Sequence, residues 1–324
     1  MSYTSRKGFV LGAVSAGLMF GLHRPVEFMP DAQAAEQSGF FQYRVGDIEL
    51  FSLDDGTIER AVDASFIPNA PIGDVRAALA GDGGAPDKYI NPFTVTAVRL
   101  DGKTVLFDTG FGATGPQSAG NLMPKMAAAG LDPAQVSTLV ISHFHPDHVG
   151  GLWMKDTNAQ VFPNAEILVP EVEYRYWTDA TVADRLPKSY QNPVIRAMVQ
   201  RIQTTFPKWS NIRPYTEGTE VVRGIYAVST PGHSPGHMSF VVASGSAQHF
   251  LQVDVTGFDR LFVRNPGWHS RLDMDGPQAE ATRRKFFERV LAEGGYIAGY
   301  HFSFPSVGML ARDGSSYVFV PRSA

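Results

Sequence analysis

The sequence predicts an α/β fold in which two β-sheets pack together and helices cover their outer faces. Strands and hairpins precede helical segments twice along the 324-residue chain, which indicates two similar halves. Histidine and aspartate, the residue types that carry chemistry, fall where predicted strands end. The composition, 44% hydrophobic and 19% charged, is that of a soluble globular protein with a large core. We therefore expect a single domain over residues 35–324.

The first half is expected to form two hairpins, a helix and a further strand. Gly46-Asp47 and Asp101-Gly102 each lie between two apolar segments, as hairpin turns do. The segment of residues 121–131 is expected to form a helix that ends at Gly130. A short helical turn then starts with Asp132 as its N-cap. The predicted strands of this half are residues 40–45, 48–53, 93–100, 103–110 and 137–143.

The second half repeats this order of elements. A helix is expected to begin at residue 171, and a second one spans residues 277–292 because apolar side chains recur there at helical spacing. Arg283, Arg284 and Glu288 are expected on the opposite, polar face of that helix. The predicted strands of this half are residues 165–170, 224–230, 238–243, 249–257, 296–301 and 317–321.

Residues 1–34 are expected to be an export signal. Basic residues 6–7 precede an apolar run at residues 8–22, and an A-x-A pattern follows at residues 32–34. The run is too short and too rich in glycine for a good membrane span. The segment SRKGFV resembles a twin-arginine motif, with Lys7 in the second arginine position. We expect a periplasmic or secreted protein without stable membrane insertion; the alternative is a membrane-anchored N-terminus.

Charge and cysteine content exclude several classes of protein. The net charge is −4 and Lys and Arg form no basic stripe, so nucleic acid is not expected as a partner. The chain contains no cysteine, which excludes disulfides, thiolate ligands and cysteine nucleophiles. A metal site in this chain must therefore use histidine, aspartate, glutamate or backbone oxygen.

The segment ISHFHPDHVGG, residues 141–151, indicates metal binding. His143 and His145 lie two positions apart just beyond a strand, so in extended backbone both side chains point the same way and can reach one ion. Asp147 and His148 come after Pro146 has turned the chain, and we expect them to bind a second ion nearby.

The remaining ligands are expected from the second half of the chain. His233 and His301 each follow a strand, and Asp254 lies among apolar neighbours, where a carboxylate is costly unless it is paired or metal-bound. Nitrogen and oxygen ligands without sulfur favour two Zn²⁺ ions per chain, and Mn, Co or Fe fit the same ligand types. The predicted site places Asp254 as a bridge between two sets, which are His143, His145 and His233 for one ion and Asp147, His148 and His301 for the other.

Two metal ions this close together predict a hydrolase. They can hold a hydroxide between them, polarise the oxygen of the bond under attack and stabilise the developing charge. Asp147 or Asp254 is expected to handle the proton, and no G-x-S-x-G stretch offers a serine nucleophile. The alternative from a different class is a non-catalytic metal-binding protein, although such a protein usually lacks some of the ligands.

The motif HFHPDH, with a later His, a later Asp and a final His, resembles the metallo-β-lactamase superfamily. The segment VLFDTG matches that superfamily's acidic motif, which implies that Asp108 is a catalytic-site residue that orients the ligands. The segments HPDHVGGL, FPNA, HSPGH and GGYIAGYHFSFPSVG are similar to methyl parathion hydrolase and its relatives, over most of the chain after Phe40. The resemblance implies a four-layer αβ/βα sandwich, a binuclear zinc site, a homodimer, and hydrolysis of phosphotriesters, aryl esters or lactones.

Aromatic residues around this site are expected to select neutral, apolar substrates. Residues 172–215 are rich in Tyr, Trp and Phe; ordinary core is one interpretation, and a pocket over the metals is the other, as the resemblance implies for Trp177. Lactone or carboxyl-ester hydrolysis is expected as the native role, with phosphotriester hydrolysis as a side activity. The predicted pocket residues are Trp177, Phe258, Phe262, Trp268 and Phe302.

Three further histidines are not expected to bind metal. His237 is expected to hold its loop by hydrogen bonds, and His249 and His269 are expected at the surface or the pocket rim. A β-lactamase-type amide hydrolase is the alternative within the superfamily. Those enzymes usually carry Cys or Ser where this chain has Asp254, which counts against that alternative.

Overall fold

The computed structural model describes residues 26–28, 38–81 and 83–322. The rest of the expected export signal, residues 1–25 and 29–34, lies outside the described residues. Residues 26–28 form strand β1 (Val26–Phe28), which pairs antiparallel with the strand that begins at Phe40.

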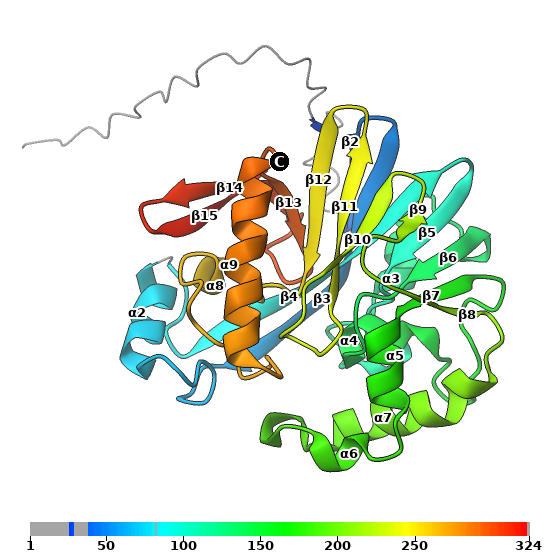
Figure 1. Ribbon diagram of the computed structural model, residues 1–324, viewed down its shortest axis with the longest axis horizontal. Coiled ribbons are helices and arrows are strands. Elements are labelled where there is room, and N and C mark those ends of the chain that lie inside the picture. Colours follow the sequence, from blue (N-terminus) through cyan, green and yellow to red (C-terminus); the bar gives the residue numbers. More distant parts are fainter. Residues whose placement is uncertain (1–25, 29–37, 82, 323–324) are drawn as a thin grey trace, which may run out of the picture.

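The described strands form two packed sheets (Figure 1), and the predicted α/β class with two mixed sheets is confirmed. In the first sheet β1 to β5 are antiparallel and β5 to β8 are parallel. After β1, its strands are β2 (Phe40–Val45), β3 (Ile48–Ala61), β4 (Lys88–Leu100), β5 (Lys103–Phe107), β6 (Val136–Val140), β7 (Glu166–Pro170) and β8 (Ile212–Tyr215).

The second sheet is antiparallel except between β12 and β13, which run parallel. Because β12 and β13 are parallel neighbours, their carboxyl ends meet at the same edge of the sheet. The strands of this sheet are β9 (Glu220–Val222), β10 (Ile225–Ser229), β11 (Met238–Ser244), β12 (Ala247–Val253), β13 (Tyr296–Gly299), β14 (Val307–Asp313) and β15 (Ser316–Pro321).

Helices cover the outer faces of the sandwich, with α9 on one flank and α5, α6 and α7 on the other (Figure 1). No helix within the described ranges is long and apolar enough to span a membrane. The α-helices are α2 (Ile72–Gly81), α3 (Leu122–Ala128), α4 (Pro146–Val149), α5 (Glu171–Thr178), α6 (Val182–Arg185), α7 (Pro193–Thr205), α8 (Asp259–Phe262) and α9 (Gly276–Ala292).

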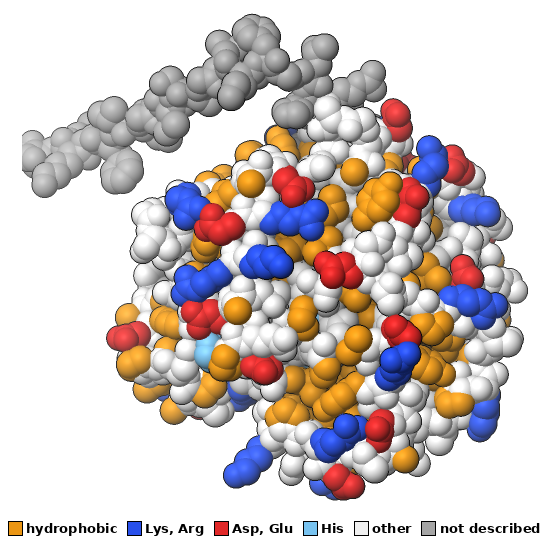
Figure 2. All heavy atoms as spheres, in the orientation of Figure 1, with side chains coloured by type: hydrophobic (Ala, Val, Ile, Leu, Met, Phe, Trp, Pro, Cys, Tyr) orange, Lys and Arg blue, Asp and Glu red, His pale blue; other side chains and the backbone are white. Residues whose placement is uncertain are grey.

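Apolar side chains from both sheets form the core. Phe107 of β5 and Phe240 of β11 make an edge-to-face contact with ring centroids 4.8 Å apart, and both belong to the largest buried cluster. Charged side chains of both signs are interspersed over the face drawn in Figure 2, in keeping with the absence of a basic stripe from the sequence.

Local turn and cap signals predict the structure well where they are strong. The Asp132 side chain accepts a hydrogen bond from the Ala134 N–H, so the predicted N-cap is present. Asp101 and Gly102 both have positive φ, 53° and 73°, in the turn between β4 and β5.

Two expectations about polar residues are wrong. Arg283 is buried on the inner face of α9, because it lies four residues after Ala279 and three before Phe286 and therefore shares their face. His249 lies in the core rather than at the surface, where its Nε2 is 3.1 Å from the hydroxyl of Tyr43. His269 is partly buried, and its Nε2 lies 2.9 Å from Glu280 Oε2.

Candidate metal centre

Strand ends from both sheets bring the seven predicted ligands to one edge of the sandwich. The loop after β6 carries His143 and His145 and leads into α4, which holds Asp147 and His148. His233 lies in the loop between β10 and β11, Asp254 follows the last residue of β12, and His301 follows β13. Residues that are far apart in the sequence therefore meet because the two sheets pack face to face.

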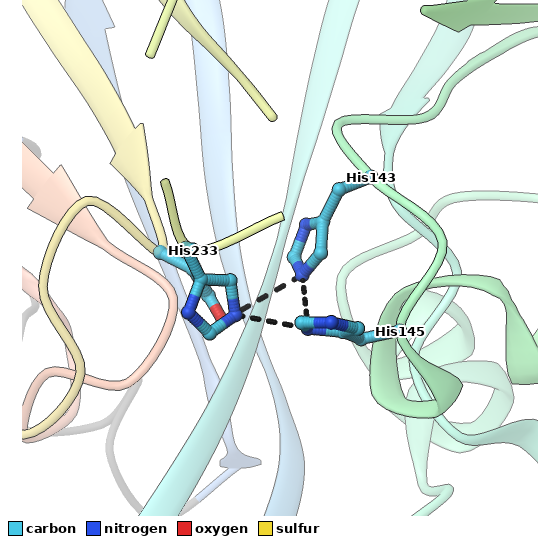
Figure 3. Close-up of side chains that lie close together, drawn as sticks. His143, His145 and His233 are labelled. Carbon is cyan, nitrogen blue, oxygen red and sulfur yellow. Dashed lines mark hydrogen bonds and ion pairs between the residues drawn. The ribbon is translucent and has the colours of Figure 1, made fainter. Parts of the chain in front are cut away.

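The first group contains His143, His145, His233 and Asp254, whose ligand atoms all lie within 4.8 Å of one another. Figure 3 shows the three rings pointing toward one another. His145 Nδ1 lies 2.8 Å from His143 Nε2 and 2.9 Å from His233 Nε2. His233 Nε2 lies 3.2 Å from Asp254 Oδ2, so the carboxylate closes the group.

The second group contains Asp147, His148, Asp254 and His301. His301 Nε2 is 3.1 Å from Asp254 Oδ2 and 3.4 Å from Asp147 Oδ2. His148 Nε2 is 3.4 Å and 3.5 Å from the same two oxygens. Asp254 belongs to both groups, which is the arrangement that the sequence predicts for a bridging carboxylate.

Hydrogen bonds at the outer ring nitrogens determine the proton positions in the first group. Ser142 Oγ donates to Asp108, so it accepts from His143 Nδ1 at 3.0 Å. The Tyr190 hydroxyl donates to the carbonyl of Leu272, so it accepts from His145 Nε2 at 2.9 Å. His233 Nδ1 lies 3.0 Å from the carboxylate of Asp273. When these histidines are neutral, each therefore turns an inner lone pair toward the other two.

The second group follows the same rule. His148 Nδ1 donates to Asp108 Oδ2 at 2.8 Å, and His301 Nδ1 donates to the carbonyl oxygen of Pro92 at 2.9 Å. Both partners accept hydrogen bonds, so Nε2 of each neutral ring is left as a lone pair. Each of the five histidines, when neutral, thus directs a lone pair toward the two carboxylates.

Buried atoms without hydrogen-bond partners show that this donor set fits divalent cations. Asp254 Oδ1 and His148 Nε2 are both fully buried and have no hydrogen-bond partner in the part of the chain that the structure describes. Such atoms are costly in a folded protein unless something else binds them. Converging lone pairs with two carboxylates and no sulfur suit a divalent metal such as zinc.

The charges of the site favour cation binding as well. Burial holds the pKa of His143 and of His145 well below the usual range, so these rings are neutral. Burial raises the pKa of Asp254, but the charges of His301 and His148 outweigh it and hold that pKa well below its usual range. The neutral rings of His143 and His145 thus face an ionised carboxylate, as metal binding requires. Burial lowers the pKa of His148, but the charges of Asp254, Asp147 and Asp108 outweigh it and hold that pKa well above its usual range. Burial also lowers the pKa of His233, but hydrogen bonds to Asp254 and Asp273 raise it to about 9, so a metal ion has to displace a proton from these two rings.

Backbone geometry positions two of the carboxylates. Val253 has a φ of 55°, which is unusual for a β-branched residue, and it directly precedes Asp254. Asp108 has a φ of 65° and lies directly after β5. A Cβ at Gly151 would lie 2.1 Å from the carbonyl oxygen of Thr109, so glycine is needed where the segment after α4 approaches the segment that holds Asp108.

Asp108 and His237 make the contacts that the sequence predicts. Asp108 accepts hydrogen bonds from His148 and from both the N–H and the hydroxyl of Ser142. His237 Nε2 accepts from the Asp254 N–H at 3.1 Å, and its Nδ1 lies 2.8 Å from Thr230 Oγ1. His237 therefore joins its own loop to the backbone of Asp254 and is absent from both ligand groups.

The predicted pocket residues lie at different places in the core. Trp177 is completely buried, and its ring lies edge-on to His145 with a centroid distance of 6.3 Å. Phe258 and Phe262 pack in the cluster of α2 and α8, with Trp268 against it. Phe302 is completely buried against Phe319. That these five residues line a substrate pocket stays a prediction.

Three residues hold the ligands in a way that the sequence does not predict. Tyr190 and Asp273 bind outer nitrogens of His145 and His233, and Glu173 of α5 binds the backbone beside these ligands. Their partners lie in distant segments, so no local motif indicates them. The available signal for Glu173 was its place four residues before Trp177, on the same face of the helix.

Residues 93–247 match the model of the metallo-β-lactamase superfamily, so the chain contains a domain of the superfamily that the motifs predict. Among curated proteins, the chain is similar to the N-acyl homoserine lactonase AttM of Azorhizobium caulinodans, with 34% identity over 121 residues. That match covers 36% of this chain and 40% of AttM. The chain thus spans less than half of the length of this curated relative.

Two solved structures share the fold over most of their length. AidC, a dizinc quorum-quenching lactonase solved with its product N-hexanoyl-L-homoserine, superposes with a TM-score of 0.81 at 25% identity, covering 89% of this chain and 98% of AidC. AbOPH, a hydrolase in the β-lactamase superfamily, superposes with a TM-score of 0.79 at 27% identity and the same coverage. The predicted αβ/βα sandwich is confirmed, and a place beside methyl parathion hydrolase stays a prediction.

Proposed function

We propose that this chain, which carries a metallo-β-lactamase superfamily domain, is a metal-dependent hydrolase that opens lactones and related neutral esters. The observation that carries the proposal is the common orientation of five imidazoles. Each outer nitrogen is bound to an acceptor, and each inner lone pair faces Asp254 or its neighbours. Catalysis by a serine nucleophile has less support, because the Ser142 hydroxyl beside His143 is completely buried and donates its proton to Asp108.

Two zinc ions per chain are the proposed cofactors. Each ligand group offers three histidine or carboxylate residues besides Asp254, and these ligand types suit zinc, with Mn, Co and Fe as alternatives. When bound, such ions lower the pKa of a coordinated water and polarise the oxygen of the bond under attack.

The chain's own carboxylates are proposed to move the proton. Asp254 Oδ1 has no hydrogen-bond partner among the described residues, so where it does not bind a metal ion it can accept a hydrogen bond from a water and orient it. Asp147 is the more exposed carboxylate, at 16% of its side-chain surface, so it is the better placed to exchange a proton with solvent. Asp108 keeps the ring of His148 in place throughout.

Lactones are the proposed substrate class because AttM and AidC, which this chain resembles, are lactonases. A lactone with a neutral acyl group carries no net charge, so its binding requires no oppositely charged side chain. Phosphotriester hydrolysis is proposed as a side activity, since metal-assisted attack can act on either electrophilic centre.

Three proposals concern the protein as a whole. Residues 35–324 form one catalytic domain, and residues 1–34, which include the edge strand β1, direct export to the periplasm or the medium. The chain acts as a homodimer. A size measurement of the purified protein tests the dimer, and N-terminal sequencing of the exported protein tests cleavage near residue 34.

The test of the proposed function is a substrate panel run on metal-loaded and chelator-treated protein. Acyl-homoserine lactones, aryl esters, phosphotriesters and β-lactams are compared by kcat/KM. We expect lactones to give the highest value and chelation to abolish it, with recovery on addition of Zn²⁺. Highest kcat/KM on β-lactams would favour the amide-hydrolase alternative, and no turnover of any substrate with metal bound would favour a non-catalytic binding protein.

A further inference from the structure

Glu173 of α5 is a buried carboxylate that lies outside both ligand groups. Its side chain is completely buried, and its two oxygens accept four hydrogen bonds from the protein. Oε2 accepts from the Phe144 N–H at 3.0 Å and from the Trp177 indole N–H at 2.7 Å. Oε1 accepts from the Ser234 hydroxyl at 2.7 Å and from the Gly236 N–H at 2.6 Å.

Three of the four donors to Glu173 belong to the two loops that form the first ligand group, and the fourth, Trp177, lies on α5 itself. Phe144 lies between His143 and His145 in the loop after β6 of the first sheet. Ser234 directly follows His233 in the loop between β10 and β11 of the second sheet. One carboxylate therefore joins the ligand loops of both sheets. Two of its donors, Phe144 and Ser234, are direct neighbours in sequence of three of the ligands.

The sequence beside Ser234 allows this close approach. A Cβ at Gly236 would lie 2.7 Å from the backbone nitrogen of Glu173 and 2.7 Å from Val172 Cβ. Real Cβ atoms do not come that close to backbone, so the loop between β10 and β11 can reach α5 because glycine occupies this position.

Only a carboxylate satisfies all four donors. An ionised carboxylate has two oxygens that accept hydrogen bonds and no proton to donate, whereas an amide presents an NH₂ group at one end. Burying a carboxylate costs free energy unless its hydrogen bonds are complete. A carboxyl group here thus has a specific use that an apolar or amide side chain of similar size cannot serve.

We infer that Glu173 is a positioning residue, which fixes the spacing between His145 and His233 by joining their loops. The inference rests on the metal binding proposed above. It assigns Glu173 no contact with substrate or metal, because its oxygens are occupied by Phe144, Trp177, Ser234 and Gly236.

The substitution Glu173→Gln separates the two sides of this clamp. Both donors at Oε2 are N–H groups that cannot accept, so the amide NH₂ is excluded from that side. At Oε1 the Ser234 hydroxyl can rotate and accept, which leaves the Gly236 N–H as the one opposed donor. The amide nitrogen therefore settles beside Ser234, and the loop that carries His233 loosens while the loop that carries His145 stays bound.

The experiment is a zinc titration of metal-free protein against a competing chelator, together with hydrogen exchange of the metal-free protein. For Glu173→Gln we expect one of two zinc affinities to fall about 10- to 100-fold, as for other outer partners of ligands, and the other to stay within about threefold. We also expect faster amide exchange over residues 230–237 than in the wild type, with residues 141–148 unchanged. The inference would be overturned if Glu173→Gln bound both zinc ions as tightly as the wild type, or if the amide exchange of both loops were the same as in the wild type.

Glu171→Gln is the matched control. Glu171 lies on the same helix, two residues earlier, and pairs on the surface with Arg175, so the substitution removes the same charge without touching the ligand loops. Its zinc affinities and exchange rates should equal those of the wild type.

The inference can still be tested if Glu173→Gln does not fold or if the wild-type protein binds no zinc. If Glu173→Gln does not fold, Ser234→Ala removes a single donor from Oε1 and should weaken one zinc site several-fold; an unchanged affinity in that folded variant overturns the inference. If wild-type protein binds no zinc, the proposed function fails, and the exchange measurement on metal-free protein still decides whether Glu173 joins the loops.

Discussion

Asp108 shows at the scale of one residue how an outer partner controls a ligand. Its carboxylate accepts from the Ser142 N–H at 2.8 Å, from the Ser142 hydroxyl at 2.7 Å and from His148 Nδ1 at 2.8 Å. The ring of His148 is thereby held with its Nε2 lone pair inward. The hydroxyl of Ser142 also contacts His143, so the same network reaches the other ligand group.

Asp108→Asn should weaken metal binding without disturbing the backbone. Asparagine tolerates the positive φ of this position, so the change acts on the hydrogen bonds, where an NH₂ group now opposes a donor. We expect the affinity of the group that contains His148 to fall about 10- to 100-fold, measured by zinc titration.

Asp101→Asn provides the control for Asp108→Asn. Asp101 also has a positive φ, but it is exposed and pairs with Arg223 far from the ligands. Its zinc affinity should match that of the wild type. An Asp108→Asn variant that binds zinc as tightly as Asp101→Asn would show that the hydrogen bond to His148 is not needed.

The sequence predicts the inner residues of the site better than the residues that hold them. The seven expected ligands fall into two groups because their spacing and their places after strands can be recognised locally. Tyr190 and Asp273 have no such signal: their contacts to His145 and His233 arise when a helical segment and a loop fold over the sandwich. His249 was expected at the surface because periodicity does not reveal a buried hydrogen bond to Tyr43.

Helix α9 supports the loops that the second sheet contributes to the site. Arg283 projects inward from this helix and donates to the carbonyl oxygens of Val255, Pro266 and Trp268. Its Nη2 also lies 3.5 Å from Asp273 Oδ2, and Asp273 in turn contacts His233. The helix thus ties together the segment after β12 and the loop that orients a ligand.

Arg283→Met should destabilise the fold strongly. The change leaves three buried carbonyl oxygens without their donor and removes the positive charge beside the buried Asp273 carboxylate, so we expect the free energy of unfolding to fall by about 3–5 kcal/mol. Arg284→Met, one position along, removes an exposed pair with Glu280 and should cost about 0.5 kcal/mol or less. Urea denaturation of both variants measures the difference, and equal stabilities would contradict this role of Arg283.

Elements with capped ends or sharp turns follow from the sequence more directly than elements without them. The hairpin around Asp101-Gly102 and the turn capped by Asp132 lie where the sequence predicts them. Helix α7 was not predicted, although Asn192 caps it and Ile195, Met198, Val199 and Ile202 are buried at helical spacing. The aromatic residues around it suggested a pocket wall, which masked the simpler helical pattern.

At the scale of the whole molecule, the two sheets are joined by a polar contact inside the core. His249 of β12 lies against Tyr43 of β2, and burial lowers the pKa of His249 from 6.5 to about 3. The unfolded chain therefore binds more protons than the folded protein between these two values. The stability from a neutral His249 is complete above pH 6.5 and is lost as the pH falls toward 3.

His249→Gln should make the fold less sensitive to acid. For a histidine that stays neutral in the folded protein, each pH unit below 6.5 lowers the free energy of unfolding by about 1.4 kcal/mol. His249 therefore accounts for a loss of about 2 kcal/mol in that free energy between pH 7 and pH 5. Glutamine does not titrate, and the variant should lose that much less in the same interval. Urea denaturation of metal-free protein at both pH values checks this, and an unchanged acid sensitivity would contradict the buried position of His249.

The central claim for the molecule is that its two halves meet to form one site for two metal ions. Anomalous scattering at the zinc edge, from crystals of protein loaded with Zn²⁺, tests this most directly. We predict two peaks, one among His143, His145, His233 and Asp254 and one among Asp147, His148, Asp254 and His301. A crystal with zinc elsewhere, or with no zinc between these side chains, would contradict the account.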